Sequence, residues 1–224
     1  MPKYRRTDPT ATFCAALRRF ATLESLELAS HHIPPEPRNT LADLDFLKSV
    51  LITVVSAFPS LQALQFGLGR AELPKEALVS VAQALPNLRH LALLTKDLDA
   101  ADLDALSHTL PSLESLAVSA WVRLPYPPPL DAGGEPTDEA RAASIAAAGD
   151  WSFAKMRRFG EFSSEQSTQR PAGRRLLKDV VEQDIFFAER FPAECKFGPV
   201  HPLTEHYVRG ASPRASLPAS PAYS

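Results

Sequence analysis

Apolar residues recur at fixed offsets through the first half of the chain. The phrase "PNLRHLAL" at 86–93 has a near copy, "PSLESLAV", at 111–118. The pattern L-x-x-L-x-L that they share begins at Leu23, Leu61, Leu88 and Leu113. These starts are 38, 27 and 25 residues apart, so the first interval carries an insertion. The alternation inside each copy predicts a short strand with its leucines on one side.

Helical periodicity fills the intervals between these strands. Apolar residues three or four positions apart predict helices over 40–57, 74–84 and 99–109. Thr40 and Asp43 are spaced as a capping box, Pro74 suits a first helical position, and Asp99 can cap the third helix. Each unit is therefore a strand, a loop and a helix, followed by Phe or Leu and then Pro.

A single strand and helix cannot bury their apolar faces alone, so such units must stack and share one core. We expect parallel strands on one side, helices on the other, and the following leucines side by side and pointing inward: Leu26, Leu64, Leu91 and Leu116. The repeated "F/L-P-x-L-x-x-L-x-L" resembles the helix-containing leucine-rich repeat proteins, most closely the degenerate repeats of fungal F-box-type proteins. The resemblance implies an α/β leucine-rich repeat solenoid of about four to six irregular repeats, with a concave strand face and a convex helix face.

The pattern loosens after residue 120. We assign 1–8 to an N-terminal extension, 9–205 to the repeat domain and 206–224 to a disordered tail, with a Pro- and Gly-rich loop at 123–136. The sequence predicts a helix from Asp138 to Ala148 ended by Gly149, and a fifth strand within 153–162 built on Met156 and Phe159. It further predicts a long helix over about 172–190 and a terminal strand with Phe197 pointing inward.

Composition narrows the classes of partner. The formal net charge is −2, so no overall field attracts nucleic acid or an anionic membrane, and we expect neither as a partner. The longest apolar stretch, 49–58, is about half of the roughly 20 residues that span a bilayer. Two distant cysteines and no N-x-[ST] sequon favour an intracellular location, cytoplasmic or nuclear.

A search for catalytic or metal-binding residues finds no strong pattern. The adjacent His31 and His32, and the pair His201 and His206, lack the spacing of a metal site, and the chain has no nucleophile elbow or phosphate loop. Helix capping explains Asp99 and Asp102 within the acidic cluster 97–104. We therefore expect a protein that is not an enzyme, with no cofactor and no metal, and a small-molecule ligand is not favoured.

Recognition is predicted on the outward side of the strands. Alternation sends the residues between the leucines to this side, where stacked strands would form a ladder. Trp121 is a candidate aromatic anchor at the rim, although packing under the proline loop explains it equally well. The candidate partner-binding residues are Ser25, Glu27, Gln65, His90, Ser115 and Trp121.

The ladder and the family resemblance together predict a module that binds another protein. The resemblance to F-box proteins implies selection of substrates for ubiquitination, although no F-box precedes the repeats. Two alternatives stay open. The chain could be a structural or truncated repeat fragment without a specific ligand, or an α/β enzyme of another class.

Overall fold

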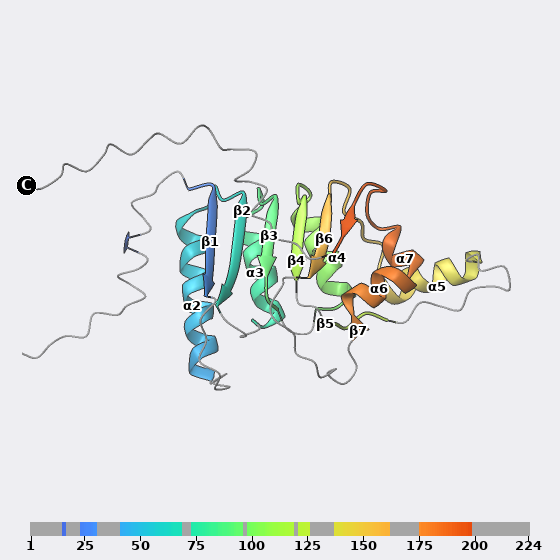
Figure 1. Ribbon diagram of the computed structural model, residues 1–224, viewed down its shortest axis with the longest axis horizontal. Helices are drawn as coiled ribbons and strands as arrows, with labels where there is room; N and C mark the ends of the chain where they lie inside the picture. The colour runs from blue at the N-terminus through green and yellow to red at the C-terminus, as the bar shows by residue number, and fades with distance from the viewer. Residues whose placement is uncertain are drawn as a thin grey trace, which may run out of the picture.

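The computed structural model describes residues 15–16, 23–30, 41–68, 73–95, 98–118, 121–125, 137–161 and 175–198. The strands are β1 (Ser25–Ser30), β2 (Ala63–Leu68), β3 (His90–Leu93), β4 (Ser115–Val118), β5 (Trp121–Val122), β6 (Arg158–Glu161), β7 (Arg175–Leu176) and β8 (Lys196–Phe197). The helices are α2 (Leu41–Ala57), α3 (Lys75–Ala84), α4 (Ala100–Thr109), α5 (Asp138–Ala148), α6 (Leu177–Gln183) and α7 (Ile185–Ala188). The protein is therefore an α/β protein, as predicted (Figure 1).

Six strands form one parallel sheet in the order β1-β2-β3-β4-β6-β8, so the strands of this sheet lie side by side in the order in which they occur in the chain (Figure 1). The remaining two, β5 and β7, pair antiparallel in a small separate sheet. One row of apolar side chains crosses the large sheet in register: Leu26, Leu64, Leu91, Leu116, Phe159 and Phe197. The first four are 8% exposed or less, which confirms the prediction that they point inward on neighbouring strands.

The recurring F/L-P-x-L phrase forms the same turn each time. In each copy the amide of the last residue donates to the carbonyl of the first, as from Leu88 to Leu85 and from Leu113 to Leu110, both at 3.0 Å. "FAKM" makes this turn without a proline, from Met156 to Phe153 at 3.2 Å. The turn reverses the chain between a helix end and the next strand, and its apolar ends are buried.

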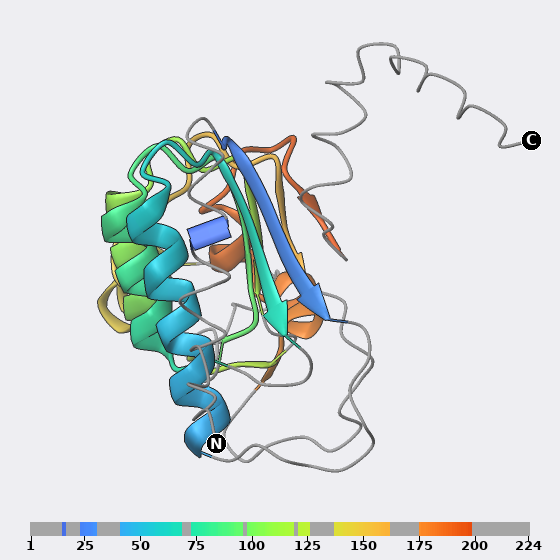
Figure 2. The same cartoon turned by 90° about the vertical axis from the view of Figure 1, so that its left-hand side faces the viewer.

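The helices α2, α3 and α4 lie side by side on one face of the sheet (Figure 2). Their apolar stripes face the strands: Val54 on α2, Leu78 and Val81 on α3, and Leu103 and Leu106 on α4 are 0–1% exposed. These stripes and the inward row of the sheet make one continuous core. The described part of the chain has no helix long and apolar enough to cross a membrane.

The starts of the helices follow their capping residues. Asp99 caps α4 in a full capping box: its side chain accepts from the amide of Asp102, whose side chain accepts from the amide of Asp99. Lys75 Nζ of α3 lies 2.7 Å from Asp99 Oδ2, which joins the two helix starts. Pro74 precedes α3 as its N-cap and is not its first helical residue.

An aromatic cluster closes the C-terminal end of the core. Phe159 of β6 contacts the rings of Phe187, Phe191 and Phe197, and Trp151 packs edge-on against Phe153 and Phe187. The predicted helix 138–148 is confirmed, since α5 is followed by Gly149 (φ 82°). The predicted fifth strand is also present and contains Phe159, but Met156 lies in the turn before it, because β6 begins at Arg158.

One prediction for this end was wrong, and another was confirmed only in part. The helix expected over 172–190 is divided into β7, α6 and α7, because Asp184 leaves helical geometry (φ −119°, ψ 91°) and its carboxylate caps α7 at the amide of Phe187. Phe197 points inward as predicted, since it pairs with Phe159 and its ring contacts those of Phe159 and Phe191, but it is still 36% exposed because β8 is an edge strand of the sheet.

Several predictions lie outside the described residues. They concern Thr40, the extension 1–8, the part of the proline loop after Pro125, and the tail 206–224.

Candidate functional site

The outward side chains of the sheet form what we call the strand face. It lies opposite α2, α3 and α4 and consists of two rows in register (Figure 2). The first row is Ser25, Ala63, His90, Ser115, Arg158 and Lys196; the second row is Glu27, Gln65, Ala92, Ala117 and Gly160. Ala92 and Ala117 form an apolar cluster separate from the main core, as expected for the opposite face of the sheet.

The structure brings five of the six predicted partner-binding residues onto this face, but it does not expose them equally. Glu27 is exposed, and Ser25 and His90 are half-buried. Gln65 and Ser115 are only 7% and 4% exposed, so the expectation that the whole ladder faces solvent was wrong. The pattern of alternation gives the side of a sheet to which a residue points, but not how much of it neighbouring groups cover.

Glu27 and Gln65 interact directly across the first two strands. They are register partners, and Gln65 Nε2 donates to Glu27 Oε1 at 2.8 Å. The pair holds the Glu27 carboxylate over β2 and satisfies the amide group of the buried Gln65. Ser115, by contrast, has a buried hydroxyl with no hydrogen-bond partner within the described ranges.

Trp121 does not join the strand face. It lies in β5, where it pairs with Leu176 of β7, and its side chain is half-buried. The nearby Arg175 is 5% exposed, and its Nη1 donates to the carbonyl of Pro125 at 2.9 Å. Trp121 is thus placed in the small sheet that joins the segment after β4 to the segment before α6.

The strand face is basic at its β6–β8 end. Arg158 and Lys196 are register partners in the first row, and Lys196 is exposed. At the start of the neighbouring strands Arg89 binds Glu114 through Nε at 2.8 Å, and Arg157 Nε lies 3.6 Å from the other carboxylate oxygen. Burial by itself raises the pKa of Glu114, but the hydrogen bond and charge of Arg89, with the charges of Arg157 and His90, lower it overall.

The sequence did not single out this basic end. "MRRF" alone reads as an isolated pair of arginines on a solvated surface. We call each strand of the large sheet, together with the residues just before it and the segment that leads toward the next strand, one coil. Arg89, Arg157 and Lys196 belong to different coils that are far apart in the chain, so their proximity depends on the strand register. Only a prediction that β6 and β8 extend the same parallel sheet would have indicated that these three residues lie close together.

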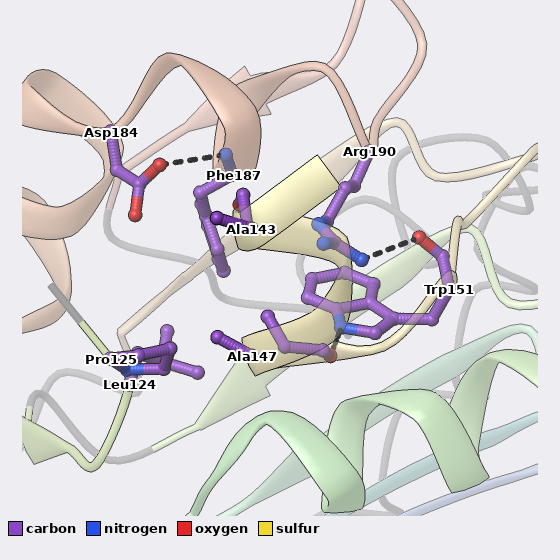
Figure 3. Close-up of a pocket in the computed structure, with 10 residues that line it drawn as sticks. Leu124, Pro125, Ala143, Ala147, Trp151, Asp184, Phe187 and Arg190 are labelled. Carbon is purple, nitrogen blue, oxygen red and sulfur yellow. Dashed lines mark hydrogen bonds between the residues drawn. The ribbon is translucent and has the colours of Figure 1, made fainter. Parts of the chain in front are cut away.

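A second feature is a small cavity of about 190 Å³ between α5, the segment after β5 and the α6–α7 junction (Figure 3). Leu124, Ala143, Ala147, Trp151 and Phe187 supply apolar walls, and Asp184 and Arg190 supply charge. The side of α5 that faces the cavity carries alanines, whose small side chains do not fill the space. Ala140 is the only buried residue of this helix.

Both charged groups of this cavity already have partners within the fold. Asp184 Oδ1 accepts from the amide of Phe187 at 3.1 Å, and Oδ2 lies 3.8 Å from Arg175 Nη1. Arg190 covers the Trp151 ring at 4.5 Å and donates to the carbonyls of Gly149 and Trp151 at 2.6 and 3.2 Å. Burial raises the pKa of Asp184 and lowers that of Arg190. These contacts assign both residues to holding α5, α7 and the aromatic cluster together.

Groups with catalytic potential are few in the described ranges. Cys195 is buried, and burial with the nearby charge of Glu194 raises the pKa of its thiol to about 11, which disfavours the nucleophilic thiolate. No three His, Cys, Asp or Glu side chains of the described segments are grouped so that they could hold a metal ion. The residues Cys14, His31, His32, Asp97, His201 and His206 lie outside those segments.

The chain was also compared with known proteins. No protein-family model and no curated protein sequence matches it.

Proposed function

We propose that the chain is a leucine-rich repeat solenoid whose strand face binds another protein. The observation that carries the proposal is the parallel register of six strands, all of which contribute to the first outward row and five of which contribute to the second. Repeat proteins of this kind offer extended surfaces because every coil adds one strand beside the last. The helices α2, α3 and α4 lie on the opposite side of the sheet (Figure 2). The middle of the strand face is nevertheless buried, so the residues available to a partner lie toward its two ends.

Repetition of the backbone contacts supports the assignment to a repeat architecture. The carbonyl of the residue before each strand accepts from two amides of the next coil: Glu24 from Gln62 and Ala63, and Arg89 from Glu114 and Ser115. Gln62 and Glu114 accept in the same way from the coils that follow them. Identical contacts in successive coils are what stacked copies of one structural unit require.

Charge at both ends of the strand face supports a protein partner. Glu27 lies at the β1 end and Lys196 at the β8 end, and both are exposed. Charged groups at the rim of an interface favour the correct partner and orientation more than they add affinity. Within the family resemblance, the narrower proposal is that the bound protein is a substrate presented for ubiquitination.

The proposal is tested by affinity capture from a cell lysate with a charge-exchanged strand face. Glu27→Arg with Lys196→Glu leaves the net charge unchanged and reverses both ends of the face. The matched control, Lys178→Glu with Glu182→Arg, makes the same exchange on exposed residues of α6. Circular dichroism establishes that each variant is folded before capture.

We expect a set of proteins that wild type and the α6 control retain and the strand-face variant loses. An identical set for all three proteins would contradict recognition by the strand face and favour a repeat fragment without a specific ligand. If a stoichiometric metal ion were found in the purified chain, the enzyme alternative would have to be reconsidered.

A further inference from the structure

The β6–β8 end of the molecule carries a group of cationic side chains that we call the basic patch. Its members are Arg89, Lys155, Arg157, Arg158 and Lys196. They come from three different coils of the chain. Arg158 and Lys196 belong to the strand face, and the other three lie at or before the starts of β3 and β6.

Contacts between the coils make the patch continuous. Arg158 and Lys196 are register partners on adjacent strands, and the amide of Lys196 donates to the carbonyl of Arg157 at 2.9 Å. Arg89 and Arg157 approach the same carboxylate, that of Glu114, from opposite sides. The strand register and the two ion pairs of Glu114 therefore position Arg89, Arg157, Arg158 and Lys196, and Lys155 lies in the turn that precedes β6.

The patch has a surplus of positive charge. With Arg158 left aside, four cations have two carboxylates beside them within the described residues, those of Glu114 and Glu194. The Glu114 side chain is only 13% exposed and is shared by two arginines, so it cannot neutralise both. Lys155 and Lys196 are exposed and form no ion pair with another residue in the described ranges. Their charge is available to a partner.

The acidic β1 end does not cancel this charge. Four strand spacings separate β1 from β6, which is roughly 19 Å at about 4.8 Å per spacing. This distance exceeds the Debye length of about 8 Å at physiological ionic strength. Glu24 and Glu27 are therefore screened from the members of the patch on β6 and β8. Arg89 precedes β3, which is two spacings or roughly 10 Å from β1, and it is screened less.

We infer that the basic patch binds a carboxylate-rich segment of the partner protein, an inference that rests on the proposed function of the strand face. Lys155 and Lys196 are exposed and can pair with carboxylates of the partner, and Arg89 and Arg157, which are engaged with Glu114, add positive charge beside them. A nucleic acid fits less well, because the single aromatic ring in the two rows within the described residues, that of His90, is half-buried. The net charge of −2 also disfavours phosphate backbones.

Fluorescence anisotropy tests the inference with a labelled ten-residue peptide of alternating Glu and Ser. A Lys/Ser peptide of the same length and a ten-nucleotide oligothymidine are the comparison probes. Lys155→Glu with Lys196→Glu alters the patch at two residues without ion pairs in the described ranges, so folding should persist. The matched control, Lys48→Glu with Lys178→Glu, makes the same charge change on exposed residues of α2 and α6.

We expect the Glu/Ser peptide to bind wild type at about 50 mM salt and to weaken at least about fivefold at 200 mM, because counter-ions screen exposed charges. The patch variant should lose at least about tenfold in affinity, and the control should stay within about twofold. Equal loss in both variants, no binding at 50 mM salt, or tighter binding of oligothymidine than of the peptide would overturn the inference. If capture depends on the strand face while the peptide fails to bind, only the acidic nature of the partner is refuted, and the proposed function stands.

Discussion

At the scale of single residues, Cys195 shows how burial can make a thiol unreactive. Its side chain is 8% exposed, and its pKa is about 11. At pH 8 roughly one molecule in a thousand carries the thiolate that attacks electrophiles. The physical role of Cys195 is therefore that of a small apolar residue beside the aromatic cluster.

We predict that this thiol is inert in the folded protein. Cys14→Ser leaves Cys195 as the single cysteine, and a chromogenic disulfide reagent at pH 8 then reports on it alone. Labelling should be at least about a hundredfold slower in the native protein than in urea, because the thiol is both buried and protonated. Native labelling as fast as in urea would show that Cys195 is accessible.

The second prediction at this scale concerns Glu114, which Arg89 and Arg157 hold in its charged form. Since its folded pKa lies below the ordinary value of 4.5, Glu114 stabilises the protein above that pH, and this contribution is lost as the pH falls through the lowered pKa. Glu114→Gln should reduce the free energy of unfolding by about 1–2 kcal/mol at pH 7. The difference from wild type should shrink below about pH 4.5.

Urea unfolding followed by circular dichroism at several pH values measures this difference. Glu182→Gln is the control, because Glu182 is exposed on α6, and it should stay within about 0.5 kcal/mol of wild type at every pH. A difference for Glu114→Gln that is constant from pH 7 to pH 3 would mean that the charge of this carboxylate does not matter.

At the scale of elements, the edge strand β8 depends on the glycine beside it. A Cβ built on Gly160 of β6 would lie 1.6 Å from the carbonyl oxygen of Gly198, and the amide of Gly198 donates to the carbonyl of Phe159 at 3.3 Å. The close approach of the two backbones is possible only without a side chain at position 160.

Gly160→Ala should therefore displace β8 from the sheet and cost about 1–3 kcal/mol or more, as overpacking does in cores. Chemical denaturation gives the stability, and hydrogen exchange at the amide of Lys196 reports whether its bond to Arg157 survives. Ser152→Ala is the control at an exposed position and should leave both unchanged. Unchanged exchange at Lys196 in Gly160→Ala would refute the steric argument.

Elements also show where local periodicity was insufficient. The apolar residues Leu177, Val180, Val181 and Phe187 fit one helical stripe, and they predicted a single helix. Asp184 interrupts this helix. At the N-cap of α7 its carboxylate accepts a hydrogen bond from the amide of Phe187, whereas in a helix interior the carboxylate would have no free backbone amide to bind. In α4 the same chemistry was correctly predicted, because Asp99 precedes the apolar stripe instead of lying within it.

At the scale of the whole molecule, contacts run mainly between neighbouring coils, and the sheet follows the chain order. Stability in such an arrangement is approximately a sum of terms from each coil and its neighbours. Damage at one end should then stay local. Phe159 is a suitable probe, since it is fully buried and touches the rings of Phe187, Phe191 and Phe197.

Phe159→Ala should cost about 3–5 kcal/mol and accelerate hydrogen exchange in α7 and β8, with little change in β2 and β3. Leu64→Ala is the matched variant toward the other end of the same buried row, and it should accelerate exchange in β1 and β2 but not in β8. Mass spectrometry of peptic fragments distinguishes these patterns. Uniform acceleration across the sheet in both variants would show that the molecule unfolds as one unit.

The sequence by itself determined the inward row of the sheet, the three helices behind it, the helix ending at Gly149 and the capping by Asp99. All of these depend on spacings of a few residues, which the chain expresses directly as a period or a cap. Only the tertiary structure decided that Gln65 and Ser115 are buried while Glu27 is exposed. It alone joined Arg89, Arg157 and Lys196 into one patch, because burial and proximity depend on neighbours that distant coils supply.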